Sequence, residues 1–367
     1  MGLRVGATVS PHLTEYRERF LIQGEKITED ALRSLGSRVA VRLDPHPSAT
    51  EITFFELGVA LALTWFAEES VDAAVVEVGM GGEFDATRAC DPVVASLVSV
   101  DMDHVRHLGP TLDDIARTKA RVVGTGGVLV VGETRPDRLA PILEEAAGRR
   151  ASTLCRGSDF SMAVRGDGLC FEGLGMQVSG IHLGLRGAHQ RGNAATATAS
   201  VLTFCDAVGQ ARPDGDQIRE GLKTAHIPGR MEHMRCPGGG AAVLLDGAHN
   251  AAGALALADA LAAEERPSRR VWLYAAMNDK DRGPLLDALL PHVDEVWCTA
   301  GSTTPRFTDP AVLAEEVAAA GGDARVLGSP ALGVQKAAAE MTADEQLLVA
   351  GSLYLVGDAR PSLLPVT

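Results

Sequence analysis

Four groups of polar residues at the ends of short apolar runs have the types and spacing that metal binding or proton transfer requires. They are Glu77-Val-Gly-Met-Gly-Gly82 with Asp85, Asp101-Met-Asp-His104, Lys119, and Asp246-Gly-Ala-His-Asn250. Open α/β sheets bind their ligands beyond the carboxyl ends of the strands. We therefore predict that these groups line a ligand site.

The first two groups supply carboxylates and an imidazole. Because Glu77 leaves an apolar strand into a glycine-rich turn, its carboxylate could reach a metal ion while the backbone approaches a ligand. The simpler alternative is a tight turn that needs glycine for its conformation alone. His104, beside Asp101 and Asp103, suits a divalent metal ion or a proton-transfer role.

The other two groups suggest a nucleotide or a phosphate. Lys119 lies in a helical pattern, where a solvated lysine is the simpler alternative. Asp246 and His249 are three residues apart and fall on one face of a turn, so they could bind a ribose or orient a phosphoryl group. These residues alone predict a nucleotide and metal site between two α/β domains. They leave a kinase, a ligase and a nucleotide-dependent dehydrogenase open.

Strands and helices must alternate to position these groups. Apolar runs predict strands at residues 73–79, 95–101 and 127–132, and helical spacing predicts helices at 53–68 and 111–123. An acid three residues after Thr111 is an N-terminal capping signature. The alternation predicts parallel βαβ units in a sheet covered on both faces.

The second half of the chain changes pattern twice. A glycine-rich stretch at 151–185 predicts a small β-meander, and a helix follows at about 190–208. Residues 227–230 and 237–240 bracket a domain junction. Strands are then predicted at 242–246, 271–275, 295–299, 324–327 and 346–350. We therefore predict one domain at 1–228, with the β subregion at 151–185, and a second α/β domain at 233–367.

Composition limits the partners. The formal net charge of −14 argues against nucleic acid, but metal ions and local cations can still hold anionic small substrates. The six cysteines contain no CxxC pair, so we expect reduced thiols. No apolar run reaches the roughly 18 residues of a membrane span, and the N-terminus has no signal-peptide pattern. We expect a cytoplasmic protein without a membrane partner.

Taken in order, the motifs resemble one family, the bifunctional dihydrofolate synthase/folylpolyglutamate synthases of the Mur ligase superfamily. Each motif alone is weak, but the ordered set covers essentially the whole chain. The stretches are Val9-Ser-Pro-His-Leu13, Glu18-Arg19, Thr53-Phe-Phe-Glu56, Glu77-Val-Gly-Met-Gly-Gly82, Phe84-Asp-Ala-Thr87, Asp103-His104, Leu108-Gly, Ile115-Ala-Arg-Thr-Lys119, Gly187-Ala-His-Gln190, Asn193-Ala, Pro228-Gly-Arg-Met-Glu232, Leu245-Asp-Gly-Ala-His-Asn250, Asp279-Lys-Asp281 and Gly351-Ser-Leu-Tyr-Leu355.

The resemblance implies an ATP-dependent, ADP-forming ligase. ATP would phosphorylate the carboxylate of dihydropteroate, of tetrahydrofolate or of both, and the amine of L-glutamate would attack the acyl phosphate. Such enzymes stabilise charge with magnesium and positioned cations. The implied fold is an N-terminal Mur-ligase-type, P-loop NTPase-like parallel sheet, truncated at its N-terminus, followed by a C-terminal Rossmann-like α/β domain.

The resemblance also implies roles for individual residues. Ser10, Glu77, His104 and Lys119 look like ligands of two Mg²⁺ ions, with Lys119 as the family's carbamylated lysine. Asn193, Arg230, Asp246 and His249 look like nucleotide contacts, and Ser352 like a residue near the glutamate site. The implied catalytic set is Lys119, His104, Asp246 and His249.

The chain departs from the family pattern before Arg4, where a strand, a phosphate loop ending in Gly-Lys-Ser or Gly-Lys-Thr, and a helix are expected. No GxxxxGK[ST] occurs in the sequence. Because that loop holds the β- and γ-phosphates, we expect kcat to fall by several orders of magnitude without it. We also expect association through the opened sheet, where a complete member would be a monomer.

Three explanations of this departure compete. We expect a truncated start. The alternatives are a loop-less paralogue that binds nucleotide or folate without turnover, and a related ligase with a different carboxylate substrate. In smaller departures, Glu83 and Arg88 stand where the family usually has Arg and Asn, and Thr118-Lys-Ala-Arg121 replaces Glu-Lys-Ala-Gly. These changes weaken the folate prediction more than the ATP-ligase prediction.

Overall fold

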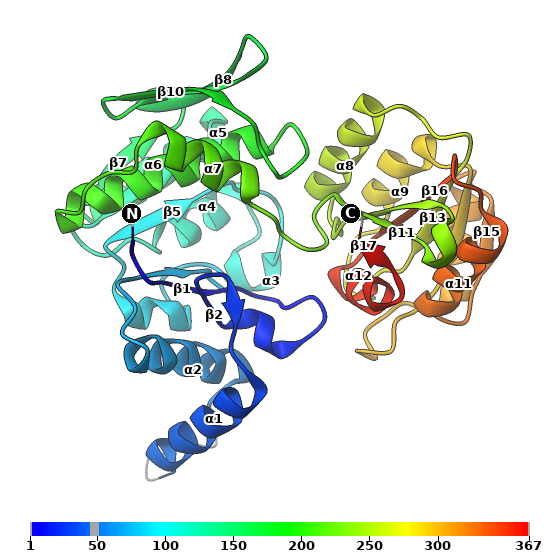
Figure 1. The fold of residues 1–367 in the computed structure, drawn as a ribbon, viewed down its shortest axis with the longest axis horizontal. Coiled ribbons are helices and arrows are strands. Elements are labelled where there is room, and N and C mark those ends of the chain that lie inside the picture. Colours follow the sequence, from blue (N-terminus) through cyan, green and yellow to red (C-terminus); the bar gives the residue numbers. More distant parts are fainter. Residues whose placement is uncertain (1, 45–50, 366–367) are drawn as a thin grey trace. The chain divides into compact units, whose positions relative to one another are not determined.

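The computed structural model describes residues 2–44 and 51–365, which fold as two compact units. Unit 1 comprises Met1–His182 and Gly192–Gly221, and unit 2 comprises Leu183–Arg191 and Leu222–Thr367. Each unit has its own hydrophobic core, so each is described by itself. Figure 1 gives the order of the elements along the chain.

The strands of unit 1 form two sheets besides a separate meander. In the first sheet the order is β3-β2-β1-β4, and β1 and β4 run parallel. The second sheet is all parallel, in the order β5-β6-β7. Within the described residues, β4 and β5 are edge strands of their sheets. The bounds are β1 (Val5–Thr8), β2 (Leu21–Ile22), β3 (Glu25–Lys26), β4 (Ala73–Val76), β5 (Val94–Leu97), β6 (Val128–Val131) and β7 (Ser152–Cys155).

Helices cover both faces of the β5-β6-β7 sheet. Ile115 of α4 and Ile142 of α5 pack with Leu97 and Leu129 in one core. On the other face, the hydroxyl of Ser200 in α6 lies 2.7 Å from that of Ser96 in β5. The helices of unit 1 are α1 (Glu29–Leu43), α2 (Phe54–Glu68), α3 (Val105–Leu108), α4 (Leu112–Ala120), α5 (Pro136–Gly148), α6 (Gln190–Val208) and α7 (Gly215–Thr224).

Side-chain caps fix where two of the predicted helices begin. The hydroxyl of Thr53 accepts from the N–H of Glu56, whose carboxylate accepts in return from the Thr53 backbone. Thr111 and Asp114 form the same reciprocal pair at the start of α4. This capping box satisfies backbone donors that a helix terminus otherwise leaves unpaired. The predicted helix starts are therefore confirmed, although α4 ends three residues earlier than predicted, at Ala120.

The predicted meander at 151–185 is partly wrong. Its first strand, β7, pairs with β6 in the parallel sheet, because the helix α5 returns the chain to that edge. The meander itself consists of β8 (Phe160–Arg165), β9 (Gly168–Gly173) and β10 (Met176–Ile181), paired antiparallel. Figure 1 shows it as a separate green layer beside α5, α6 and α7.

Unit 2 contains a seven-stranded sheet in the order β15-β14-β13-β16-β12-β11-β17. The five predicted strands are present and mutually parallel. Two further strands extend the sheet beyond β12. β11 pairs antiparallel with β12, and β17 pairs antiparallel with β11. The bounds are β11 (Glu232–Arg235), β12 (Ala242–Leu245), β13 (Arg270–Tyr274), β14 (Glu295–Cys298), β15 (Ala324–Val326), β16 (Gln346–Ala350) and β17 (Leu364–Pro365).

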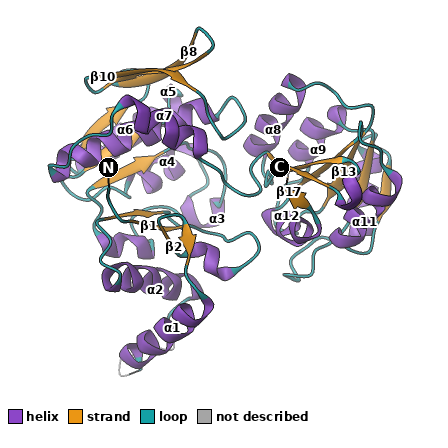
Figure 2. Ribbon diagram, in the orientation of Figure 1, coloured by secondary structure: helices purple, strands orange, loops and turns teal. Residues whose placement is uncertain are grey.

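Both faces of this sheet are also buried, which explains its continuous apolar strands. Trp272 and Tyr274 face the core formed with α8, α9 and α10, whereas Leu273 between them contacts Gly333 of α11. Figure 2 shows the helices on both sides of the strands. Their bounds are α8 (Ala251–Ala263), α9 (Gly283–Leu289), α10 (Pro310–Ala319), α11 (Pro330–Glu340) and α12 (Leu353–Ala359).

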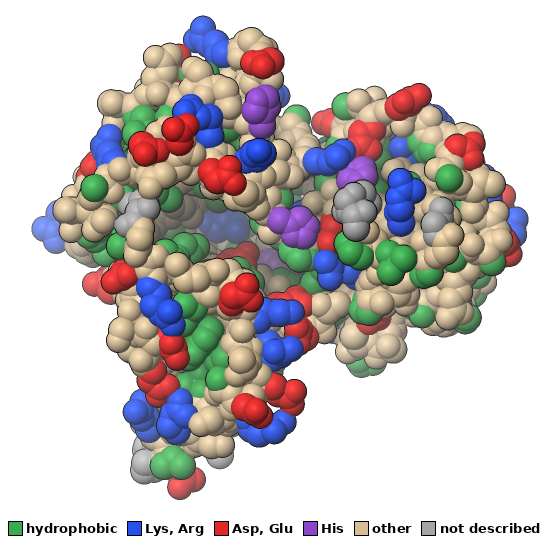
Figure 3. Space-filling view, in the orientation of Figure 1, with side chains coloured by type: hydrophobic (Ala, Val, Ile, Leu, Met, Phe, Trp, Pro, Cys, Tyr) green, Lys and Arg blue, Asp and Glu red, His purple; other side chains and the backbone are tan. Residues whose placement is uncertain are grey.

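The visible face of each unit carries many charged side chains, with hydrophobic side chains exposed between them (Figure 3). Acidic and basic side chains are intermixed over the visible face of each unit in Figure 3. Among the described residues, no helix is both long enough and apolar enough to cross a membrane.

Candidate active site at the strand ends

Neighbouring parallel strands bring Ser10 and Glu77 together in unit 1. Ser10 follows β1 and Glu77 follows β4, and the backbone N–H of Ser10 donates to Glu77 Oε2 at 2.7 Å. The N–H of Glu77 donates to the carbonyl of Thr8 at 2.9 Å, which continues the strand pairing up to the carboxylate. Two of the predicted metal ligands therefore lie side by side at the carboxyl ends of β1 and β4.

The glycine-rich turn after Glu77 packs directly on the helix that carries Lys119. A Cβ placed on Gly82 would lie 2.6 Å from the Thr118 carbonyl oxygen and 3.0 Å from that of Lys119. Only glycine permits this backbone approach. Asp85 closes the turn, because its carboxylate accepts from the N–H of Met80 at 2.9 Å. Glycine at position 82 is thus required for the close packing of this turn on α4, the helix that carries Lys119.

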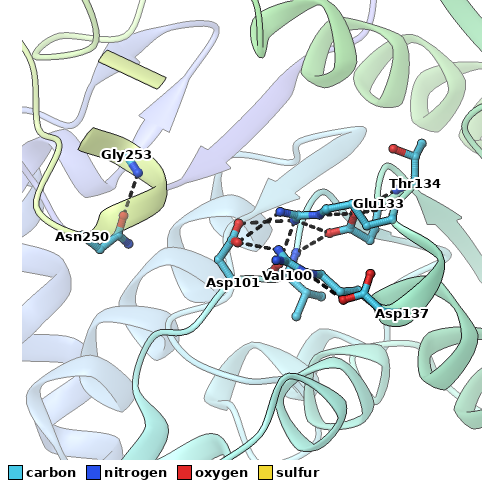
Figure 4. A network of polar contacts seen from close by, with 9 residues as sticks. Val100, Asp101, Glu133, Thr134, Asp137, Asn250 and Gly253 are labelled. Atoms are coloured by element: carbon cyan, nitrogen blue, oxygen red, sulfur yellow. Dashed lines mark hydrogen bonds and ion pairs between the residues drawn. The ribbon is translucent and has the colours of Figure 1, made fainter. Parts of the chain in front are cut away.

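The second group divides its residues between two tasks. The carboxylate of Asp101 accepts from the guanidinium groups of Arg135 and Arg138. Figure 4 shows Asp101 within this network, next to Val100 and Glu133. Asp103 accepts from the N–H of His104 at 2.9 Å. His104 has φ 51° and ψ 34°, the left-handed region, and begins α3. Its ring is about half exposed, so it is accessible to a ligand.

Lys119 is not the solvated lysine that helical position alone would suggest. Its side chain is partly buried, and burial lowers the pKa of Lys119, while the negative charges of Asp103 and Asp101 act in the opposite direction. These carboxylates belong to the loop after β5. Residues of the second polar group therefore act electrostatically on Lys119.

Residues that depart from the family pattern interact with one another. Glu83 forms ion pairs with Arg149 at 2.8 Å and with Arg121 at 3.3 Å. Arg88 donates to the Val122 carbonyl at 3.1 Å. These contacts fasten the turn after β4 to the C-terminal end of α4. Of the departing residues, Glu83 and Arg121 thus pair directly with each other.

In unit 2, Asp246 follows β12 and is nearly buried, at 9% exposure. Its carboxylate accepts from the N–H of Met231 and of Ala248, both at 2.9 Å. Burial raises the pKa of Asp246, and these hydrogen bonds and the charge of Arg230 oppose the rise. The N–H of Gly247 also donates to the Gly229 carbonyl at 2.9 Å. The loops of Arg230 and Asp246 are thus joined.

The other predicted residues of unit 2 have local partners. His249 Nδ1 lies 2.8 Å from the Gly247 carbonyl oxygen, which orients its ring. Asn250 caps α8 by accepting from the N–H of Gly253 (Figure 4). Ser352 is buried after β16 and caps α12. Asn193 lies near the start of α6 and belongs to unit 1, unlike these residues.

The sequence analysis did not assign a role to His189. Burial lowers the pKa of His189, the negative charge of Asp246 opposes this lowering, and the charge of Arg230 adds to it. All three residues belong to unit 2. The place of His189 in Gly187-Ala-His-Gln190 was the available signal. The arginines around Asp101 had no signal in the sequence, because Arg135 precedes α5 and Arg138 lies within it, more than thirty residues from Asp101.

The residues of unit 1 are compatible with a divalent metal ion. The hydroxyl of Ser10 and the carboxylate of Glu77 are oxygen donors of the type that magnesium prefers, and His104 adds a nitrogen donor. Among the described residues, no three His, Cys, Asp or Glu side chains form a ready metal cluster. The predicted set contains only two residues of those types, so Ser10 and Lys119 would have to complete it.

Comparison with known proteins follows this geometry. Residues 229–353 match the model of the Mur ligase glutamate ligase domain. The probable bifunctional folylpolyglutamate synthase/dihydropteroate synthase of Halobacterium salinarum is 36% identical over 98% of this chain and 43% of its own length. The dihydrofolate synthase/folylpolyglutamate synthase of Mycobacterium tuberculosis is 37% identical over 85% of this chain and 67% of its own length. The chain belongs to the dihydrofolate synthase/folylpolyglutamate synthase family.

Solved structures of this family confirm the predicted two-domain α/β Mur ligase fold. E. coli FolC in complex with DHPP and ADP has a TM-score of 0.85, with 28% identity over 98% of this chain and 82% of its own. The Yersinia pestis folylpolyglutamate synthase/dihydrofolate synthase with AMPPNP and Mn has a TM-score of 0.84, with 30% identity over the same shares. The chain spans 43% of the length of the first two curated relatives.

Proposed function

We propose that this chain is an ATP-dependent ligase that joins L-glutamate to a folate-type carboxylate, either dihydropteroate or tetrahydrofolate. The relatives named as folylpolyglutamate and dihydrofolate synthases support the reaction class. DHPP and ADP in the E. coli relative support a pteroate-type acceptor and a nucleotide. The observation that carries the proposal is the partly buried Lys119 beside the loop of Asp103 and His104 and the turn after Glu77.

The chemistry proceeds in two displacements. A carboxylate oxygen of the acceptor attacks the γ-phosphorus of ATP, which gives an acyl phosphate and ADP. The amine of glutamate then attacks the acyl carbon, inorganic phosphate leaves, and the nitrogen loses a proton as the amide forms. Neither displacement needs a protein nucleophile, so binding, orientation and charge stabilisation carry the catalysis.

We assign the residues to these tasks by unit. In unit 2, Arg230, Asp246 and His249 hold the nucleotide, and Ser352 lies near the glutamate, with Asn193 of unit 1 as a further nucleotide contact.

In unit 1, Ser10, Glu77, His104 and a carbamylated Lys119 would hold Mg²⁺. Divalent ions supply charge neutralisation on phosphate oxygens in such reactions. The Mn ion in the Yersinia relative supports the use of a divalent cation.

The proposal is tested by measuring phosphate release with ATP, Mg²⁺, L-glutamate and either dihydropteroate or tetrahydrofolate. We expect slow release, because the sequence contains no GxxxxGK[ST] loop to hold the phosphates. The release should require both the acceptor and glutamate, and L-aspartate should not replace glutamate. Hydroxylamine in place of glutamate should trap the acyl phosphate as a hydroxamate. Nucleotide binding without acceptor-dependent release would fit a truncated enzyme or a binding-only paralogue. If release is still absent after the expected strand, phosphate loop and helix are added before Arg4, the ligase is overturned and the binding-only paralogue is favoured. Release with neither pteroate compound but with another acid would indicate a different carboxylate substrate.

A further inference from the structure

We propose that Glu133, Arg135 and Arg138 form a positioning clamp on the loop 98–104, and that this clamp holds His104 in place beside Lys119. Glu133 and Arg135 lie in the connection between β6 and α5, and Arg138 lies in the first turn of α5, whereas the loop follows β5. The role assigned to His104 rests on the proposed ligase function. The evidence for the clamp itself is the network in Figure 4.

Glu133 is the centre of the clamp. Its side chain is 3% exposed, and its carboxylate accepts from five N–H groups of Val100, Thr134 and Arg135. The bond from the Val100 N–H crosses from one strand–helix connection to the other at 2.9 Å. A buried carboxylate is tolerated only with such partners, and a fully satisfied network restricts the local geometry.

The two arginines hold the next peptide of the loop. The carbonyl of Val100 accepts from Arg135 Nη2 at 2.8 Å and also from Arg138 Nη1. The carboxylate of Asp101 accepts from both guanidinium groups. Glu133, Arg135 and Arg138 therefore hold the loop by hydrogen bonds to the N–H and carbonyl of Val100 and to the side chain of Asp101. Because the carboxylate of Asp101 is hydrogen-bonded to both arginines, it anchors the loop rather than binding a metal ion.

His104 needs such support because it has a left-handed backbone conformation. A non-glycine residue in this region is strained and persists only where the surroundings determine it. The grip on Val100 and Asp101 ends three residues before His104. Burial lowers the pKa of Lys119, and the negative charges of Asp103 and Asp101, both in this loop, oppose that lowering. A shift of the loop would therefore change the position of His104 relative to Lys119.

The two arginines use their nitrogens differently, which gives a test that separates positioning from mere packing. Arg138 contacts the loop with one nitrogen, Nη1, which donates to both the Val100 carbonyl and Asp101. A lysine ammonium can replace that donor because it carries three protons. Arg135 donates from Nε to Glu133, from Nη1 to Asp101 and from Nη2 to the Val100 carbonyl. A single ammonium group cannot reach three acceptors placed this way. We expect Arg138→Lys to hold the loop 98–104 as the parent chain does. We expect Arg135→Lys and Arg138→Met to lose this hold on the loop.

The experiment compares these three variants of the full chain with Arg165→Met, which removes an ion-paired arginine from the meander. Amide hydrogen exchange is measured for residues 98–104 and for α4. In Arg135→Lys and Arg138→Met, exchange should accelerate in the loop while α4 stays protected. Arg138→Lys and Arg165→Met should resemble the parent chain. Unchanged exchange in the two failing variants, or equal effects of Arg138→Lys and Arg138→Met, would overturn the clamp.

A second measurement follows the His104 ring itself by NMR during titration with Mn²⁺ alone. The parent signal should broaden, and broadening should require more Mn²⁺ in the two failing variants. Outer-shell substitutions usually cost about 10- to 100-fold in metal affinity or activity. The same loss is expected in kcat, with the KM for glutamate unchanged. If the parent signal does not broaden, the metal role of His104 in the proposed function fails, while the exchange measurement still decides the clamp.

Discussion

His104 is the residue whose proposed role depends most on backbone conformation. It begins α3 in the left-handed region, directly after Asp103, which accepts its backbone N–H. The ring is about half exposed, and Asp103 and Asp101 of the same loop oppose the lowering of the Lys119 pKa by burial. A substitution there removes the imidazole without opening a cavity, so its effect on folding should be small.

In a version of the chain that carries the phosphate loop expected before Arg4, we expect His104→Ala to abolish turnover, because the proposed metal site loses a ligand. Phosphate release should fall by at least about 100-fold, while the unfolding temperature stays near that of the parent. His107→Ala, three residues along the same short helix, is the matched control. Near-normal kcat in His104→Ala would remove His104 from the site.

Lys119 offers a chemical test of the carbamate. Lys119→Ala should be inactive, and a short carboxylic acid added to the assay should partly restore phosphate release by supplying the missing oxygens. The same acid should not restore His104→Ala. An absence of rescue in a folded variant would argue against carbamylation of Lys119 and leave the family assignment untouched.

At the level of elements, the clamp joins the β5 and β6 connections through one buried carboxyl. Burial would raise the pKa of Glu133, but hydrogen bonds from the Arg135 side chain, and from the backbone of Arg135 and Val100, lower it from 4.5 to about 2. Arg135, Arg138 and Asp101 are the charged groups gathered around it. A carboxyl with a depressed pKa stabilises the folded state above its unfolded pKa and loses that contribution as pH falls through the folded value.

The stability that depends on Glu133 should therefore be present at pH 7 and decrease between about pH 4.5 and pH 2. The size of this contribution is about 3 kcal/mol, from 1.36 kcal/mol for each pH unit between the two pKa values. Unfolding of unit 1 should be followed by hydrogen exchange in the parent and in Glu133→Gln across this range. A difference between the two proteins that does not change with pH would contradict the prediction.

At the level of the whole molecule, the edge strands of unit 1 bear on self-association. Val75 in β4 is 64% exposed and Val98, just after β5, is 45% exposed, although both lie in apolar strand sequences. Exposed apolar edges of sheets are templates for pairing with another chain. The sequence analysis predicted association, and these edges supply a location for it.

We expect the chain to associate in sedimentation experiments at micromolar concentration and Val75→Lys to reduce the association. A charge on an edge strand disfavours pairing. Val164→Lys is a matched control, because Val164 is 61% exposed on the meander. A parent chain that remains monomeric, or equal effects of the two substitutions, would show that β4 is not the contact.

The sequence determined those features that depend on neighbours along the chain. Capping residues fixed the starts of α2 and α4 through hydrogen bonds three residues apart. Continuous apolar runs located the parallel strands of unit 2, because both faces of that sheet are buried. The ordered motifs indicated the family, and local spacing placed Glu77, Asp101 and Asp246 after strands.

Tertiary structure alone decided which of these groups meet. β7 joined the parallel sheet because α5 returned the chain to β6, a choice that apolar alternation does not encode. Asp101 became a handle for two arginines more than thirty residues away. Burial of Lys119 and the approach of Gly82 to its helix likewise depend on packing between distant segments. Side chains of the same type differ in role because their surroundings set their partners, exposure and charge.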